Sequence, residues 1–141
     1  MSGQYAARTG VYTVVSLARG EERDRKMRVP TNVIELPLNR VTVANALKAA
    51  GYATALFGKW HLGYPPEFSP LKSGYDQFFG LFGCCTDYFN HGAEARLAYT
   101  LPIPGLASQL HEQEVPVERQ GYMTNLLGDR AVQTIEGYAR S

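Results

Sequence analysis

Lys59 and His61 stand two residues apart and combine a fixed positive charge with a group that can transfer a proton. A lysine ammonium binds anionic oxygens as a compact cation. An imidazole donates, accepts or transfers a proton near neutral pH. If the backbone is extended here, the two side chains share one face and Trp60 points the opposite way. The pattern indicates an oxyanion site, although a solvated strand end accounts for the same spacing.

The stretch that must position these residues is a short, mostly apolar run over residues 52–57, entered through Gly51. Its length and composition predict a strand covered on both faces, as in a parallel sheet. Gly58 is expected to end the run. Ligands of open α/β sheets bind beyond the carboxyl ends of the strands. Lys59 and His61 would therefore lie where substrates usually bind.

A helix is predicted immediately before this strand, over residues 42–50, with the Thr42 hydroxyl capping its first turn. Gly51 suits the left-handed position after its end. We expect the helix to place one apolar stripe on the sheet. The stripe consists of Val43, Ala46, Leu47 and Ala50.

Weaker patterns cover the rest of the chain. Residues 14–17 could form a short strand, and residues 74–80 are turn-rich with Phe78 and Phe79 expected in the core. Residues 92–116 are expected to form a long loop with an exposed His111. A second helix is predicted over residues 124–138 with Thr124 as its cap. Its apolar face would contain Leu127, Ala131, Ile135 and Tyr138.

Composition narrows the class of protein. The chain has 141 residues, is 45% hydrophobic and 19% charged, and carries a net charge of +1, which is typical of a globular domain. Near-neutral charge gives no reason to expect nucleic acid as a partner. No apolar run approaches the ~20 residues that a membrane span needs. No basic-then-apolar leader is recognisable, so we expect no signal peptide within these residues, and the compartment is left unassigned.

One longer stretch resembles a known family signature. Residues 51–63, GYATALFGKWHLG, are similar to the second signature of the type I sulfatases, G-Y-x-T-x-x-x-G-K-W-H, at every fixed position. Three other stretches resemble further blocks of that family, and all four occur in family order. These three are SGQYAARTGVYT at 2–13, PLKSGYDQFFGLFG at 70–83 followed by DYFNH at 87–91, and GYMTNLLGDRAVQTIE at 121–136.

The resemblance implies an α/β fold of the alkaline-phosphatase-like type, with a mixed or parallel sheet flanked by helices. It implies hydrolysis of a sulfate ester through a formylglycine nucleophile and a divalent cation, usually calcium. In the family, the lysine matched by Lys59 binds a sulfate oxygen. The histidine matched by His61 hydrogen-bonds the formylglycine hydroxyl and takes its proton. His91 would lie near the mouth of the site, where it either contacts the substrate or hydrogen-bonds its own loop.

Other parts of the family pattern are missing from this sequence. Neither the nucleophile motif nor the aspartates and asparagine that bind the metal are recognisable, and Cys84 and Cys85 do not fit that motif. We expect buried thiols at these two positions, and no metal ligands within the chain. Residues 1–141 are therefore expected to be an incomplete piece of one sulfatase N-terminal catalytic domain, inactive alone.

The substrate expected for the parent is a sulfated small molecule or a sulfated glycan. Two alternatives stay open. A phosphonate or phosphodiester hydrolase of the same superfamily has similar motifs, and a pseudo-sulfatase fragment would have no catalytic function.

Overall fold

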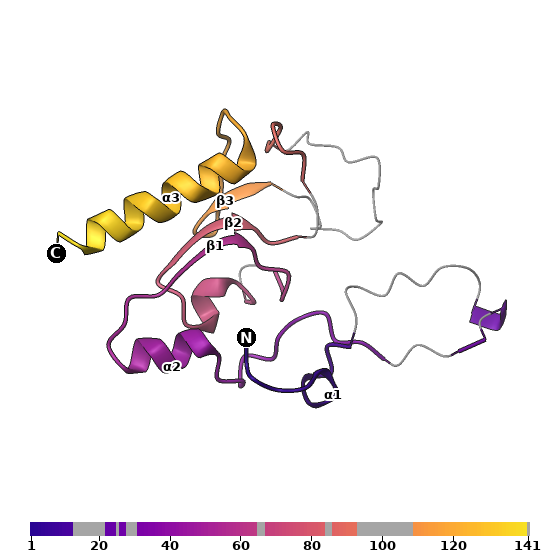
Figure 1. The fold of residues 1–141 in the computed structure, drawn as a ribbon. Coiled ribbons are helices and arrows are strands. Elements are labelled where there is room, and N and C mark those ends of the chain that lie inside the picture. The colour runs from indigo at the N-terminus through magenta and orange to yellow at the C-terminus, as the bar shows by residue number, and fades with distance from the viewer. Residues whose placement is uncertain are drawn as a thin grey trace.

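The computed structural model describes residues 1–12, 22–24, 26–27, 31–64, 67–83, 86–92 and 109–140. Its helices are α1 (Ala6–Thr9), α2 (Val43–Ala49) and α3 (Met123–Tyr138), and its strands are β1 (Ala55–Lys59), β2 (Gln77–Leu81), β3 (Leu110–Glu112) and β4 (Val115–Pro116). Two short 3-10 turns cover Glu22–Asp24 and Pro70–Ser73. Figure 1 shows the strands as one sheet between α3 and α2.

The sheet is mixed and open, with the strand order β1-β2-β3-β4. β1 and β2 are parallel, with Ala55 opposite Gln77 and Lys59 opposite Leu81. β3 runs antiparallel to β2, and β4 antiparallel to β3. Within the described residues, the other edge of β1 has no neighbouring strand. The predicted α/β class, a mixed or parallel sheet flanked by helices, is confirmed.

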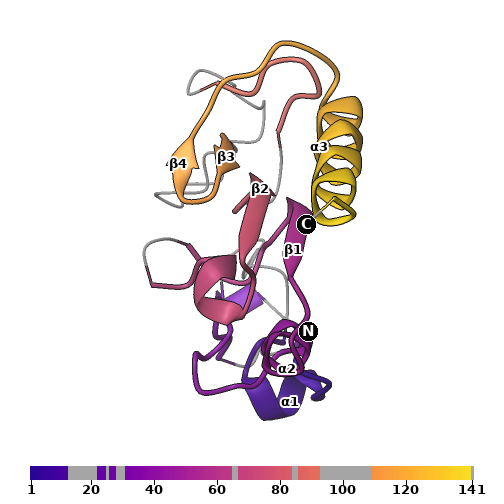
Figure 2. The ribbon, with the colours of Figure 1, turned by 90° about the vertical axis from the view of Figure 1, so that its left-hand side faces the viewer.

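Each face of the sheet carries its own apolar cluster, because side chains alternate along a strand. Phe79 and Leu81 pack with Leu110 and Met123 under the first turns of α3. On the opposite face, Phe78 packs with Trp60 and Phe82, covered by loops. Figure 2 shows α3 alongside β1 and β2 on one side of the sheet. The expectation that Phe78 and Phe79 belong to the core is confirmed, since they are 2% and 3% exposed.

The helix predicted before β1 is present, and its local signals are confirmed. Thr42 and Asn45 form a capping box in which each side chain accepts a hydrogen bond from the other residue's backbone N–H. Gly51 adopts a left-handed conformation with φ of 87°. These contacts satisfy backbone groups that the helix end leaves free.

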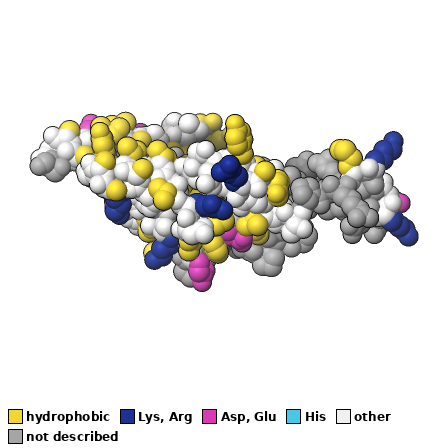
Figure 3. Space-filling view, turned by 90° about the horizontal axis from the view of Figure 1, so that it is seen from below, with side chains coloured by type: hydrophobic (Ala, Val, Ile, Leu, Met, Phe, Trp, Pro, Cys, Tyr) yellow, Lys and Arg dark blue, Asp and Glu magenta, His cyan; other side chains and the backbone are white. Residues whose placement is uncertain are grey.

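The apolar stripe of α2 does not pack on the sheet, contrary to prediction. Val43 and Leu47 are 51% and 42% exposed, and Ala44 is the buried helix residue. The reason is that the start of the helix packs on the turn before β2, where the Thr42 hydroxyl donates to the Ser73 carbonyl at 2.6 Å. The stripe therefore faces outward. Figure 3 shows hydrophobic side chains at the surface of the region that carries α2 and the end of α3.

The predicted strand bounds were partly wrong. β1 begins at Ala55, not Tyr52, and it passes through Gly58, which adopts a φ of 130° that a glycine tolerates. β1 is also only half-buried, and among the described residues no strand pairs with its outer edge. β2 (Gln77–Leu81) forms where the sequence predicted turns.

The loop expected over residues 92–116 contains the hairpin formed by β3 and β4. These strands have three and two residues, which is too short for a periodic pattern to reveal. His111, expected to be exposed, lies half-buried in β3 with its ring edge-on to Phe82, 4.7 Å between centroids. Residues 93–108 lie outside the described part of the chain.

α3 confirms the second predicted helix, but it begins at Met123 after Tyr122, with no side-chain cap. Its first turns contact the core through Leu126 and Leu127, whereas Ile135 is 67% exposed. The predicted strand at 14–17 and the two cysteines lie outside the described residues. No helix in the described ranges has the length and apolarity needed to cross a membrane.

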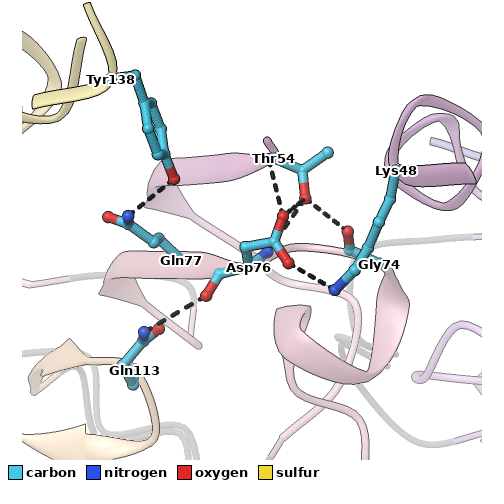
Figure 4. A network of polar contacts seen from close by, with 7 residues as sticks. All are labelled: Lys48, Thr54, Gly74, Asp76, Gln77, Gln113 and Tyr138. Atoms are coloured by element: carbon cyan, nitrogen blue, oxygen red, sulfur yellow. Dashed lines mark hydrogen bonds and ion pairs between the residues drawn. The ribbon is translucent and has the colours of Figure 1, made fainter. Parts of the chain in front are cut away.

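The carboxylate of Asp76 fixes the entry to β1 and β2. It accepts hydrogen bonds from the Thr54 backbone N–H at 3.0 Å and the Thr54 hydroxyl at 2.9 Å, and it pairs with the Lys48 ammonium on α2. Figure 4 shows Thr54 and Lys48 converging on this carboxylate. The hydrogen bond from Lys48 and those from Thr54 lower the pKa of Asp76 from 3.8 to about 2.

Replacing Asp76 by asparagine should therefore change the pH dependence of stability. A carboxylate whose pKa is lower in the folded state stabilises the fold above its ordinary pKa and loses that contribution as the pH falls. The urea midpoint of Asp76→Asn should be lower than that of the wild type at pH 7. As the pH falls from 3.8 to about 2, the urea midpoint of Asp76→Asn should decrease less than that of the wild type. The control is Asp129→Asn, the same change on the exposed surface of α3, which should leave the urea midpoint at pH 7 nearly unchanged. The prediction would be contradicted if the urea midpoint of Asp76→Asn followed that of the wild type at every pH.

Candidate oxyanion site

Lys59 is the last residue of β1, at the carboxyl end of the parallel pair of strands. Its side chain is exposed. Alternation along β1 places it on the side of Phe57, and it places Trp60 on the side of Leu56. The two core clusters agree, since Phe57 packs in one and Trp60 packs with Leu56 in the other. The ammonium therefore projects from the sheet edge while the next side chain is buried.

Trp60 anchors the turn that follows β1. It is 5% exposed, its indole N–H donates to the Phe68 carbonyl at 2.8 Å, and its ring meets Tyr75 edge-on at 6.1 Å. Its backbone N–H continues the ladder to the Leu81 carbonyl at 2.8 Å. A large aromatic held by packing and a satisfied N–H fixes the backbone around it. The residues on either side of Trp60 are thereby held in place.

His61 departs from the extended backbone on which the predicted geometry depended. Its φ is 60°, in the left-handed region that non-glycine residues rarely adopt. Its N–H still donates to the Phe82 carbonyl at 3.1 Å, which ties the turn to β2. The side chain is half-buried, and its Nε2 atom is buried without a hydrogen-bond partner among the described residues. A buried polar atom without a partner is costly, so this nitrogen lacks a hydrogen bond that a bound group would supply.

The electrostatics link His61 to Lys59. Burial, and then the positive charge of Lys59, lower the pKa of His61 below its usual 6.5. The charge of Lys59 is the smaller of the two causes. That the two side chains share one face stays a prediction, because His61 leaves the extended backbone on which it depended. At pH 7 the ring is neutral, with a nitrogen lone pair that can accept a proton.

Removing the Lys59 charge should raise the pKa of His61. We expect the His61 ring signals of Lys59→Met to titrate at a higher pH than in the wild type, followed by ¹H–¹³C NMR. His111 is a control within the same chain, because burial lowers its pKa but Lys59 does not contribute. A titration of His61 that is unchanged in Lys59→Met would show that the two groups do not interact.

His91 lies in a different environment. It is 1% exposed, its Nε2 lies 2.8 Å from the Tyr88 carbonyl oxygen, and its Nδ1 lies 3.1 Å from the Arg119 carbonyl oxygen. Its own carbonyl accepts from the Leu110 N–H at 3.2 Å. The ring thus joins its own loop to the segment before α3. The substrate contact predicted for His91 stays a prediction, and it would require the ring to leave these two partners.

The described residues include no group of three or more histidine, cysteine, aspartate or glutamate side chains that could hold a metal ion. The acidic side chains near the sheet are instead paired with cations. Asp76 pairs with Lys48, and Glu112 pairs with Arg119 and Arg130 at 2.9 and 2.6 Å. These paired carboxylates, which are spread over the sheet, do not form a donor set that fits a divalent cation.

The family model of the sulfatases matches residues 1–139, nearly the whole chain. The chain therefore belongs to the sulfatase family, as the four sequence blocks indicated. Membership of this family implies a divalent metal. The residues that the structure describes include no group of side chains that could bind it.

Named relatives agree with the family assignment. N-acetylgalactosamine-6-sulfatase of Sus scrofa is 38% identical over 84 residues, which cover 60% of this chain and 15% of that protein. Arylsulfatase G of Rattus norvegicus is 49% identical over 51 residues, which cover 36% of this chain and 10% of that protein. The chain thus spans a small part of the length of these relatives.

A solved structure has the same fold. A crystal structure of Ps i-CgsB in complex with k-i-k-neocarrahexaose aligns with a TM-score of 0.64 at 23% sequence identity, over 77% of this chain and 25% of that one. At this identity the likeness supports the arrangement of helices and strands. It says nothing of the substrate.

Proposed function

We propose that this chain supplies the oxyanion-binding part of a sulfuric ester hydrolase, with Lys59 and His61 as its catalytic residues. One observation carries the proposal: His61 follows Lys59 by two residues at the carboxyl end of a parallel strand, and its buried Nε2 has no hydrogen-bond partner among the described residues. The charge of Lys59 also lowers the pKa of His61. Lys59 binds a sulfate oxygen and neutralises the charge that develops on it as the ester bond breaks. His61 accepts a proton from the hydroxyl that the nucleophile presents.

The nucleophile and the metal would come from other parts of a complete domain. Family resemblance supports formylglycine as the nucleophile and calcium as the divalent cation. The substrate would be a sulfate ester on a glycan, which the name of the N-acetylgalactosamine-6-sulfatase relative supports. We also propose that residues 1–141 alone are inactive, because removing both nucleophile and metal removes most catalytic power.

The inactivity proposal is tested on the purified 141-residue chain. With calcium and 4-nitrophenyl sulfate, we expect the same rate for the wild type and for Lys59→Ala. Turnover by the wild type above the Lys59→Ala background would contradict it.

The reaction class is tested in a complete sulfatase domain that contains this chain, by comparing kcat/KM for an aryl sulfate, a phosphate diester and a phosphonate ester. We expect the sulfate to be hydrolysed fastest. Preference for the phosphorus esters would identify the alternative hydrolase. No turnover of any of them by a folded domain would favour the pseudo-enzyme.

A further inference from the structure

Three aromatic rings, Tyr88, Phe89 and Tyr122, form an exposed cluster on the loops near His91. Tyr122 contacts both of the others, with ring centroids 5.3 Å apart and ring planes tilted by 34° and 35°. The three side chains are 58%, 69% and 38% exposed. Contiguous apolar side chains left exposed on a surface are a feature of ligand-binding and protein-binding sites. We call these three residues the aromatic platform.

The loop that carries the platform is held firmly. The Asp87 carboxylate accepts hydrogen bonds from the Phe89 and Asn90 N–H groups, both at 2.8 Å. The Tyr88 carbonyl accepts from the Met123 N–H at 2.8 Å, where α3 begins, and it lies beside the His91 ring. Figures 1 and 2 both show this loop beside the segment that enters α3. The rings are thus arranged before a ligand arrives, which lowers the entropic cost of binding.

The aromatic platform lies at the same edge of the sheet as Lys59. Lys59 pairs with Leu81, Leu81 pairs with Leu110, and the Leu110 N–H donates to the His91 carbonyl. With about 4.8 Å between neighbouring strands, the His91 backbone lies roughly 14 Å across the sheet from Lys59. An extended ligand could therefore reach both sites, whereas a single sugar could not.

Given the function proposed above, on which this inference rests, we infer that the aromatic platform binds a pyranose ring of a sulfated oligosaccharide whose ester lies at Lys59 and His61. One face of a pyranose presents C–H groups that carry slight positive charge, and these pack on the negative face of an aromatic ring. Asp87 and Asn90 lie in the same loop as Tyr88 and Phe89, and a carboxylate and an amide are groups that can bond sugar hydroxyls. The charges agree with this arrangement, because the Lys59 ammonium would bind the sulfate and the uncharged aromatic rings would contact the sugar.

The test uses the 141-residue chain and a hexasaccharide of alternating uronic acid and 6-sulfated N-acetylgalactosamine, with its desulfated form and N-acetylgalactosamine 6-sulfate as further probes. Binding is measured by calorimetry, and folding is checked by circular dichroism. We expect Phe89→Ala and Tyr122→Ala each to weaken binding of both hexasaccharides about tenfold. Phe89→Trp keeps a ring and should retain affinity. Tyr52→Ala removes a 63% exposed ring beside α2 and should have no effect.

The outcomes separate this inference from the function on which it rests. Unchanged affinity in folded Phe89→Ala and Tyr122→Ala, or no binding of either hexasaccharide to the wild type, would overturn the aromatic platform. If the aromatic platform were overturned in this way but Lys59→Ala weakened binding of the sulfated probes, the proposed function would stand and the aromatic platform would not. If Phe89→Ala weakened binding of the desulfated hexasaccharide while Lys59→Ala affected no probe, the platform would stand and the oxyanion site would fail.

Discussion

Lys59→Ala in a complete sulfatase domain that contains this chain should lower kcat for an aryl sulfate by about two to three orders of magnitude, the usual effect of removing one donor to a developing negative charge. The ammonium stands at the end of β1, and its neighbour Trp60 is buried and hydrogen-bonded, so the backbone that presents Lys59 is fixed. A smaller side chain would leave the sulfate oxygen without that charge. The measurement is steady-state kinetics at saturating substrate.

The matched control in the same domain is Lys72→Ala, which removes an exposed lysine from the turn before β2. It should leave kcat within about twofold, because an isolated surface charge contributes little. His61→Ala should resemble Lys59→Ala, since it removes the proton acceptor. Equal activity of Lys59→Ala and Lys72→Ala would end the role assigned to Lys59.

Gly80→Ala should strongly destabilise the pairing of β1 with β2. Gly80 lies opposite Gly58 in the parallel pair, and a Cβ added there would lie 1.8 Å from the Gly58 carbonyl oxygen and 2.7 Å from its carbon. These are backbone atoms, which cannot rotate away as a side chain can. The strands would have to separate, at a cost of about 3 kcal/mol or more in the free energy of unfolding. The measurement is a urea unfolding curve followed by circular dichroism.

Gly128→Ala makes the same chemical change where the structure has room. A Cβ at Gly128 in α3 meets no atom within 4 Å, and alanine favours a helix over glycine by up to about 1 kcal/mol. The two substitutions should therefore move the urea midpoint in opposite directions. A midpoint of Gly80→Ala equal to that of the wild type would mean that β1 and β2 are not as close as described.

Local signals allowed α2 and its caps to be predicted from the sequence. Thr42 caps its own helix and Gly51 ends it, so both depend on near neighbours only. The exposed stripe of α2 could not be foreseen, because its burial depends on whether the helix packs against the sheet or against the Ser73 turn. Helical periodicity identifies the apolar face of a helix but not the surface on which that face packs.

At the candidate site, the residue types could be predicted and the geometry only in part. The order lysine, tryptophan, histidine predicted that Lys59 and His61 form one site. The lowering of the His61 pKa by the charge of Lys59 is consistent with that prediction. The left-handed backbone of His61 has no signal in the sequence, since the surrounding contacts impose it. The close approach of Gly58 and Gly80 was also missed, because it depends on the register of two strands that are distant in sequence.

Within the part of the chain that the structure describes, one side of β1 pairs with no strand, and this has a practical consequence for handling the protein. No residue of β1 is proline, and its only charged side chain is Lys59 at its end. Residues 55–58 therefore lack the two devices that commonly stop a free strand from joining a second chain. A concentrated sample should therefore self-associate, with β1 recruiting strands from other copies. Dilution or the substitution Ala55→Lys should suppress such oligomers.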